Sequence, residues 1–150
     1  MGASEVMVSL LILLPLGGSA LLLLFGRRLG EPAAGILGTL TVGAAFVLAL
    51  VAGREFLAGT GEAQAVPWFD WLPALRVGAG LLWDPLSALM AMVVTGVGAL
   101  IHVYSLGYMR GDPRVGRFFA YMNLFVASML ILVLADGFAL LFVGWELVGL

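Results

Sequence analysis

The stretch VMVSLLILLPLGGSALLLLFG, residues 6–26, contains no charged side chain. As a helix rising about 1.5 Å per residue, it is long enough to cross a hydrocarbon layer of roughly 30 Å. It is longer than the apolar part of a signal peptide, and the five residues before it include no Lys or Arg. We therefore expect a retained membrane-spanning helix at this position.

Four more apolar segments follow, and the whole chain is 63% hydrophobic and 11% charged. Soluble domains carry about 25% charged residues, so this composition indicates a membrane protein. We predict an all-α, polytopic transmembrane helix bundle that forms a single membrane domain over residues 1–150. The expected helices cover about 6–26, 32–53, 84–108, 117–135 and 138–150. The last is about 20 Å long, too short to span, which suggests a fragment of a longer protein.

The arginines predict how the bundle is oriented. Five of the seven Lys and Arg residues lie in loops 27–31 and 109–117, which must share one side of the membrane if the first three segments span. The positive-inside rule places both loops in the cytoplasm, and the N terminus and loop 54–83 outside. We expect a multi-pass protein of the inner (plasma) membrane.

The outer loop contains Trp68, Trp71 and Trp83, which fit an aromatic belt at the membrane surface. Residues 75–82 contain two apolar patches around a Gly-x-Gly. This pattern is compatible with a short β-hairpin and equally with an irregular interfacial loop.

Glu146 lies in the last apolar segment, within Gly144-Trp-Glu-Leu-Val-Gly149. An ionised carboxylate near the bilayer centre costs about 3 kcal/mol or more, so such a residue is by default a candidate for proton movement. The glycines would let a neighbouring helix approach and shield the carboxylate. No Lys or Arg is visible at membrane depth, so an ionic partner would lie outside this chain. The alternative is a protonated packing residue.

Three further side chains have candidate roles. His102 is a candidate proton relay, and the alternative is an interfacial histidine beside Tyr104 and Tyr108. Asp84 precedes Pro85 and is expected to cap the third helix, since Pro suits the first helical position. Asp136 is expected to be a cap or turn residue before the fifth segment.

The composition also argues against several functions. Cysteine is absent, which excludes disulfides and thiolate-held metal or iron–sulfur clusters, and one histidine cannot form a metal site alone. Gly96-Val-Gly98 lacks the third glycine of a dinucleotide fingerprint. The few arginines lie at helix ends, so nucleic acid is not an expected partner. We expect no cofactor and no metal on this chain, and the lipid bilayer as its surroundings.

From Asp84 onward the chain resembles subunit L of bacterial NADH:quinone oxidoreductase, the antiporter-like subunit of respiratory complex I related to mitochondrial chain 5. The motifs that carry the resemblance are Asp84-Pro-Leu-Ser87, Val94-Thr-Gly-Val-Gly98, Ile101-His-Val-Tyr104, Gly107-Tyr-Met-Arg-Gly111, Arg117-Phe-Phe-Ala-Tyr-Met-Asn-Leu-Phe125, Leu132-Val-Leu-Ala-Asp136 and Gly144-Trp-Glu-Leu-Val-Gly149. Residues 1–83 resemble the family only in their pattern of two helices and an outer loop.

The resemblance implies a 14-helix core built from two inverted five-helix repeats. This chain would supply the first four helices and part of the fifth. In the family, the glutamate that matches Glu146 pairs with a lysine on a later helix and helps to drive proton translocation. The resemblance further implies an enzyme complex whose flavin, iron–sulfur clusters and nicotinamide belong to a peripheral arm. This chain would then perform no redox catalysis, and its partners would be the other membrane subunits.

Some of these sequence features also fit other families. The Gly-Trp-Glu motif also resembles the large subunit of Mrp-type Na⁺/H⁺ antiporters and membrane subunits of energy-converting hydrogenases. Arg117-Phe-Phe-Ala-Tyr together with Ala135-Asp136 favours complex I. An alternative of a different class is a structural membrane subunit, without transport, in which Glu146 is buried and permanently protonated.

Overall fold

The computed structural model of the chain describes residues 3–72 and 77–149. Its elements are α1 (Ala3–Leu29), α2 (Glu31–Leu57), β1 (Gln64–Leu72), β2 (Val77–Trp83), α3 (Pro85–Tyr108), α4 (Val115–Leu134) and α5 (Phe138–Gly149). Among the described residues, helices α1 to α4 have the length and apolar composition of membrane spans, and α5 is a shorter apolar helix. The predicted helical membrane bundle is confirmed.

Helices α1 and α2 extend beyond the uncharged stretches that predicted them. The segments expected at 6–26 and 32–53 are helical over Ala3–Leu29 and Glu31–Leu57. Arg27 and Arg28 stand in the last turn of α1, and Glu31 in the first turn of α2. Long charged side chains reach into interfacial water while their backbone remains helical, and these signs suit the helix dipole. In these two segments a charged residue therefore does not mark the end of the helix.

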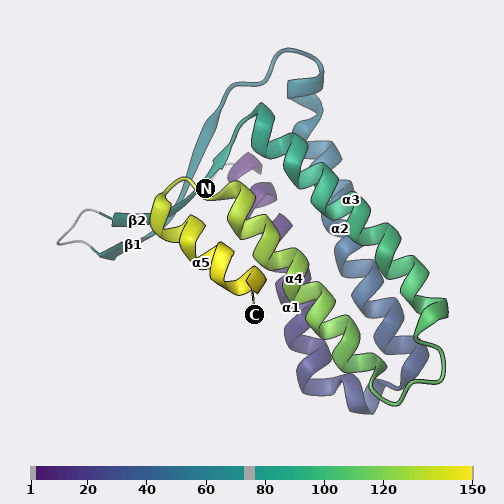
Figure 1. Ribbon diagram of the computed structural model, residues 1–150. Coiled ribbons are helices and arrows are strands. Elements are labelled where there is room, and N and C mark those ends of the chain that lie inside the picture. Colours follow the sequence, from purple (N-terminus) through teal and green to yellow (C-terminus); the bar gives the residue numbers. More distant parts are fainter. Residues whose placement is uncertain (1–2, 73–76, 150) are drawn as a thin grey trace.

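The first four helices form one bundle, and α5 lies against α4 (Figure 1). Helix α1 packs on α2 and α4, and α2 also packs on α3. The buried face of α2 consists almost entirely of small residues, which let helix backbones approach closely in a membrane. These residues are Ala34, Gly35, Gly38, Val42, Ala45, Ala49 and Gly53.

Strands β1 and β2 form an antiparallel hairpin at one end of the bundle (Figure 1). Of the two alternatives left open by the sequence, the hairpin is the one observed, but its Gly-x-Gly is not the turn: Gly78 and Gly80 pair within β2, opposite Asp70 and Pro67. Residues 73–76 lie outside the described residues. The Gly80 carbonyl accepts the Asp136 backbone N–H at 2.9 Å, so the strand is held close to the segment between α4 and α5.

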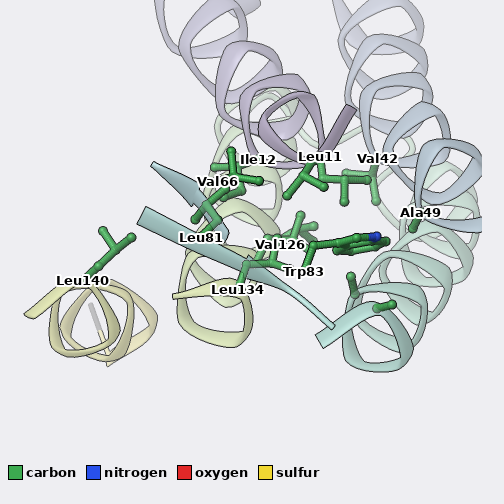
Figure 2. Packing of buried hydrophobic residues seen from close by; sticks show 14 residues of the cluster. Leu11, Ile12, Val42, Ala49, Val66, Leu81, Trp83, Val126, Leu134 and Leu140 are labelled. Carbon is green, nitrogen blue, oxygen red and sulfur yellow. The ribbon is translucent and has the colours of Figure 1, made fainter. Parts of the chain in front are cut away.

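The main buried cluster joins the hairpin to the helices, and Figure 2 shows Trp83 among aliphatic side chains from several elements. Trp83 is only 3% exposed and lies 6.1 Å from the Phe56 ring, centroid to centroid. The Trp68 indole N–H donates to Ser9 Oγ at 3.0 Å, and Trp71 is exposed. The aromatic-belt interpretation is therefore wrong for Trp83, which ends β2 and packs its ring into the main buried cluster.

Helix α3 begins with a capping box, which confirms the role predicted for Asp84. The Ser87 N–H donates to Asp84 Oδ1 at 2.7 Å, and the Asp84 N–H donates to Ser87 Oγ at 2.8 Å. The backbone hydrogen bond from Ser87 holds the pKa of Asp84 below its ordinary value of 3.8. Asp136 forms the bend before α5 and is bound to the hairpin through its backbone.

Candidate functional site

Helix α5 is positioned by a glycine contact with α4. A Cβ atom placed on Gly144 would lie 2.7 Å from the Leu132 backbone nitrogen, closer than real Cβ atoms approach. The two backbones therefore touch at this point. Leu140, one turn earlier on the same face, is buried in the main cluster and labelled in Figure 2. One face of α5 is thus fixed against the bundle.

Glu146 lies on the other face of α5. It follows Gly144 by two residues, about 200° around a helix, and is exposed on the surface of this chain. Within the described residues its carboxylate has neither a hydrogen bond nor an ion pair. Among the described residues, Gly144 makes its close contact on the side of α5 opposite Glu146, and no neighbouring group lies within 4 Å of a Cβ placed on Gly149. Shielding of the carboxylate by a further helix at Gly149 stays a prediction. The carboxylate is directed away from the helices described.

His102 is completely buried in the bundle. Its Nδ1 lies 2.7 Å from the Gly98 carbonyl oxygen and its Nε2 lies 3.2 Å from Asn123 Nδ2. A carbonyl only accepts and an amide nitrogen only donates, so these partners assign the proton to Nδ1 and leave Nε2 as the acceptor. Tyr104 and Tyr108 stack on each other at the exposed surface. The alternative of an interfacial histidine beside them is therefore wrong.

Asn123 joins His102 to two other helices. Its Nδ2 also lies 3.0 Å from the Phe119 carbonyl and 3.2 Å from the Gly38 carbonyl, and its Oδ1 accepts from Thr41 Oγ1 at 2.6 Å. We call Thr41, His102 and Asn123 the buried polar junction; it connects α2, α3 and α4.

Helix α1 closes the buried polar junction from a fourth side. A Cβ atom on Gly18 would lie 2.5 Å from Thr41 Oγ1 and 2.8 Å from Asn123 Oδ1, so only a glycine leaves room for the junction there. In the described part of the chain, no buried side-chain nitrogen or oxygen lacks a hydrogen-bond partner. A satisfied polar cluster in an apolar bundle fixes the relative positions of its helices.

The sequence reasoning found His102 but missed Asn123 and Thr41. A signal for Asn123 was available, because an amide in the middle of an uncharged membrane segment needs partners. Thr41 gave no such signal, since a threonine hydroxyl is satisfied by a carbonyl of its own helix, as Thr39 is by Gly35 at 2.8 Å.

The structure does not join the two predicted proton-transfer residues. No side-chain hydrogen bond links Glu146 to His102 in the ranges 3–72 and 77–149, and the two residues belong to α5 and α3. The described residues also contain no cluster of three or more His, Cys, Asp or Glu that could hold a metal ion. The candidate site is therefore an acidic group facing outward from a helix bundle that carries its own internal polar junction.

The chain is similar in sequence to membrane subunits of NADH-quinone oxidoreductases. Residues 68–119 match the family model described as the N-terminus of NADH-ubiquinone oxidoreductase (complex I) chain 5. The chain is 47% identical over 145 residues to NADH-quinone oxidoreductase subunit L of Mycobacterium tuberculosis, covering 94% of this chain and 23% of that protein. It is 44% identical over 146 residues to subunit L of Escherichia coli K12, covering 96% of this chain and 24% of that protein.

The similarity extends to plants and to a solved structure. The chain is 38% identical to NADH-ubiquinone oxidoreductase chain 5 of Arabidopsis thaliana, covering 96% of this chain and 22% of that protein. The Mrp complex from Dietzia sp. DQ12-45-1b matches 93% of this chain and 14% of its own with a TM-score of 0.71 and 31% identity. The chain thus spans about a quarter of the length of these three subunit L and chain 5 relatives.

Proposed function

Because the chain resembles the N-terminal part of subunit L of NADH-quinone oxidoreductase along most of its length, we propose that it is part of a proton-translocating, antiporter-like membrane subunit of that complex. Quinone reduction elsewhere in the complex would drive proton movement through this subunit. The chain itself would perform no redox catalysis and hold no cofactor. It would therefore act as part of a translocase.

The observation that carries this proposal is the position of Glu146. It is an acidic residue on the apolar helix α5, and it faces away from the other four described helices. Such a residue needs a partner at membrane depth, because an unpaired carboxylate in hydrocarbon is costly. We propose that this partner is a basic side chain of a later helix. Changes in its distance or hydration would then let Glu146 take up and release a proton.

The proposed surroundings follow from the topology. The protein would lie in the plasma membrane with the N terminus and the hairpin outside and loops 27–31 and 109–117 in the cytoplasm. Its neighbours would be other membrane subunits, which connect it to a flavin- and iron–sulfur-containing arm. Cysteine labelling that found residues 109–117 outside the cell would contradict this orientation.

The transport role is tested by replacing the acid in the full-length subunit within its complex. Glu146→Gln keeps the shape and removes the exchangeable proton, so the proton-to-electron ratio in sealed vesicles should fall while assembly and NADH oxidation persist. Trp145→Phe, at the adjacent exposed position, is the control and should leave the ratio unchanged. An unchanged ratio in Glu146→Gln would sink the assignment.

His102 is the second candidate, as a proton relay. The side-chain amide of Asn123 donates to His102 Nε2 and cannot accept a proton from it. A proton relay through the ring therefore requires that this hydrogen bond break. The geometry therefore favours a fixed role in the buried polar junction over a relay. In His102→Gln, a relay predicts lost pumping at normal subunit abundance. A fixed role predicts lower abundance with normal pumping per assembled complex.

A Mrp-type Na⁺/H⁺ antiporter is the second candidate function, favoured by the likeness to the Dietzia Mrp complex. Mass spectrometry of proteins that co-purify with the tagged subunit from its native membrane separates the two. Flavin- and iron–sulfur-binding subunits support complex I, whereas small membrane subunits without redox proteins support the antiporter.

A structural subunit without transport is tested by isotope-edited infrared spectroscopy on the assembled complex. A transport role predicts that the carboxyl band of Glu146 changes across pH and turnover. A protonated carboxyl band that stays constant under both conditions would support the structural alternative.

A further inference from the structure

A groove opens at the end of the bundle where α1 finishes and α4 begins. It has a volume of about 930 Å³ and is lined by the last turns of α1, the loop at 111–114 and the first turns of α4. The two helices meet here through glycines: a Cβ on Gly116 would lie 3.2 Å from the Gly26 backbone. Because neither helix has a side chain at this contact, the neighbouring long side chains border a hollow.

Three arginines line the groove, together with two acids. Arg114 pairs weakly with Asp112, with 4.0 Å between Nε and Oδ1. For Arg27 and Arg117, the described residues supply no acidic partner. The two acids of the groove are engaged by loop backbone: Glu31 accepts the Gly111 N–H at 2.8 Å, and Asp112 accepts the Arg114 N–H at 2.7 Å. The groove therefore has two guanidinium groups available for an anion.

The wall of the groove on the side of the membrane centre is apolar. Leu23 and Leu24 precede Arg27 by one turn, and Tyr121 follows Arg117 by one turn. All three side chains are exposed, and Leu24 is 73% exposed. Since α1 and α4 have the length and composition of membrane spans, we expect the arginines at headgroup level and this wall in hydrocarbon. The groove is charged at its outer end and apolar at its inner end.

We propose that this groove binds an anionic glycerophospholipid. Arg27 and Arg117 would contact the phosphodiester oxygens, because a guanidinium group donates paired hydrogen bonds to phosphate. One acyl chain would lie along Leu23, Leu24 and Tyr121. A free phosphate ion satisfies only the outer half of the groove, and an apolar ligand only the inner half. The lipid matches both halves, and basic pockets between membrane helices commonly bind the headgroups of anionic lipids. This inference is independent of proton transport.

The chain offers matched controls for a direct test. Arg28 stands beside Arg27 in the last turn of α1, and Arg110 lies in the segment that joins α3 to α4, but neither residue lines the groove. The double variants R27Q/R117Q and R28Q/R110Q remove the same charge from the same end of the bundle. A general electrostatic attraction to the membrane surface would respond equally to both variants, whereas a built site responds only to the first.

The experiment uses the full-length subunit in its intact complex, reconstituted in nanodiscs with photoactivatable phosphatidylglycerol. We expect labelled peptides from 20–27 and 115–121. Labelling should fall about tenfold or more in R27Q/R117Q, since each charge-assisted hydrogen bond lost is worth about tenfold in binding. It should stay near the wild-type level in R28Q/R110Q. Excess unlabelled phosphatidylglycerol should compete, and inorganic phosphate should not.

Three outcomes overturn the proposal. Equal loss in both double variants would show a diffuse charge effect, and equal labelling by a photoactivatable phosphatidylcholine would show no preference for anionic lipid. Crosslinks from a photoactivatable amino acid at Leu24 that reach protein rather than lipid would show that another segment or subunit fills the groove. Subunit abundance in each variant is measured beside the labelling, so that a failure to fold is recognised.

Discussion

The buried polar junction and Glu146 are two polar features in the same apolar bundle, and they differ in where their partners lie. Thr41, His102 and Asn123 meet their hydrogen-bonding needs from α2, α3 and α4. Glu146 finds no such partner in the described residues and lies on the outward face of α5. A polar group whose partners are all internal stabilises one arrangement of helices. A polar group without an internal partner can instead bind a partner outside the described helices, and the position of that partner can change.

The largest expected effect separates the two regions by function. Glu146→Gln should lower transport through this subunit about 100-fold, at the lower end of what a positioned proton-transfer group contributes. The buried polar junction should keep its hydrogen bonds, because Glu146 makes no hydrogen bond or ion pair with the described helices. Proton flux in vesicles and backbone hydrogen exchange around the junction in the purified full-length subunit measure the two effects. Exchange around the junction that accelerated as much as in an Asn123 variant would place Glu146 among the structural residues.

The reverse behaviour is expected for Asn123→Leu. The substitution leaves Thr41, His102 and the Gly38 carbonyl without a shared partner, and hydrogen bonds inside membrane proteins contribute about 0.6 to 1.7 kcal/mol each. We expect a loss of about 2–3 kcal/mol in the free energy of unfolding.

Ser128→Ala is the matched control for Asn123→Leu. Ser128 is also buried on α4, but its hydroxyl donates only to Leu124 of the same helix. It should cost less than about 1 kcal/mol. Equal losses in the two variants would mean that the junction does not hold separate helices together.

The same contrast explains what could be predicted from the sequence. The helices were predictable because uncharged stretches of about 20 residues have few alternatives to a membrane span. The cap at Asp84 was predictable because Asp followed by Pro is a local signal with a local partner, Ser87. These features depend on neighbours along the chain.

The features that were not predicted depend on contacts between distant segments. His102 is 21 residues from Asn123 and Thr41 is 82 residues from it, so no local pattern indicates that they meet. Trp83 was assigned to the membrane surface because its type is common there. Trp83 is instead the last residue of β2, and its buried ring packs against Phe56. The outward direction of Glu146 likewise depends on which face of α5 touches α4.

A smaller effect tests how α5 is held. Gly144→Ala places a methyl group 2.7 Å from the Leu132 nitrogen, so α5 must shift away from α4. We expect a cost of about 1–3 kcal/mol from overpacking. Gly149→Ala is the control, because no neighbouring group of the described residues lies within 4 Å of the added Cβ. Thermal unfolding of the full-length subunit should separate the two. An equal cost would show that the glycine contact is not what positions Glu146.

The smallest effect concerns the start of α3, which leads from the hairpin to the buried polar junction. Asp84→Ala removes the carboxylate that accepts the Ser87 N–H, a change that costs about 1 kcal/mol at a helix N terminus. Hydrogen exchange at the first turn of α3 should therefore accelerate about fivefold. Asp84→Asn retains a side-chain acceptor and should exchange nearly as the wild type does at neutral pH.

The pH dependence of this cap has a definite sign. The hydrogen bond from Ser87 lowers the pKa of Asp84 below 3.8, so the folded state favours the ionised form. The resulting stabilisation is fully present above the unfolded pKa and is lost as the pH falls through the lower, folded value. Asp84→Asn has no charge to lose, so its exchange at the first turn should not respond to the same titration.

Because the cap lies at the helix terminus, acid should loosen the first turn of α3 while the buried polar junction, about four turns further along the helix, keeps its hydrogen bonds. Acid-induced exchange that reached His102 at the same pH as Ser87 would instead mean that the cap and the junction unfold as one unit.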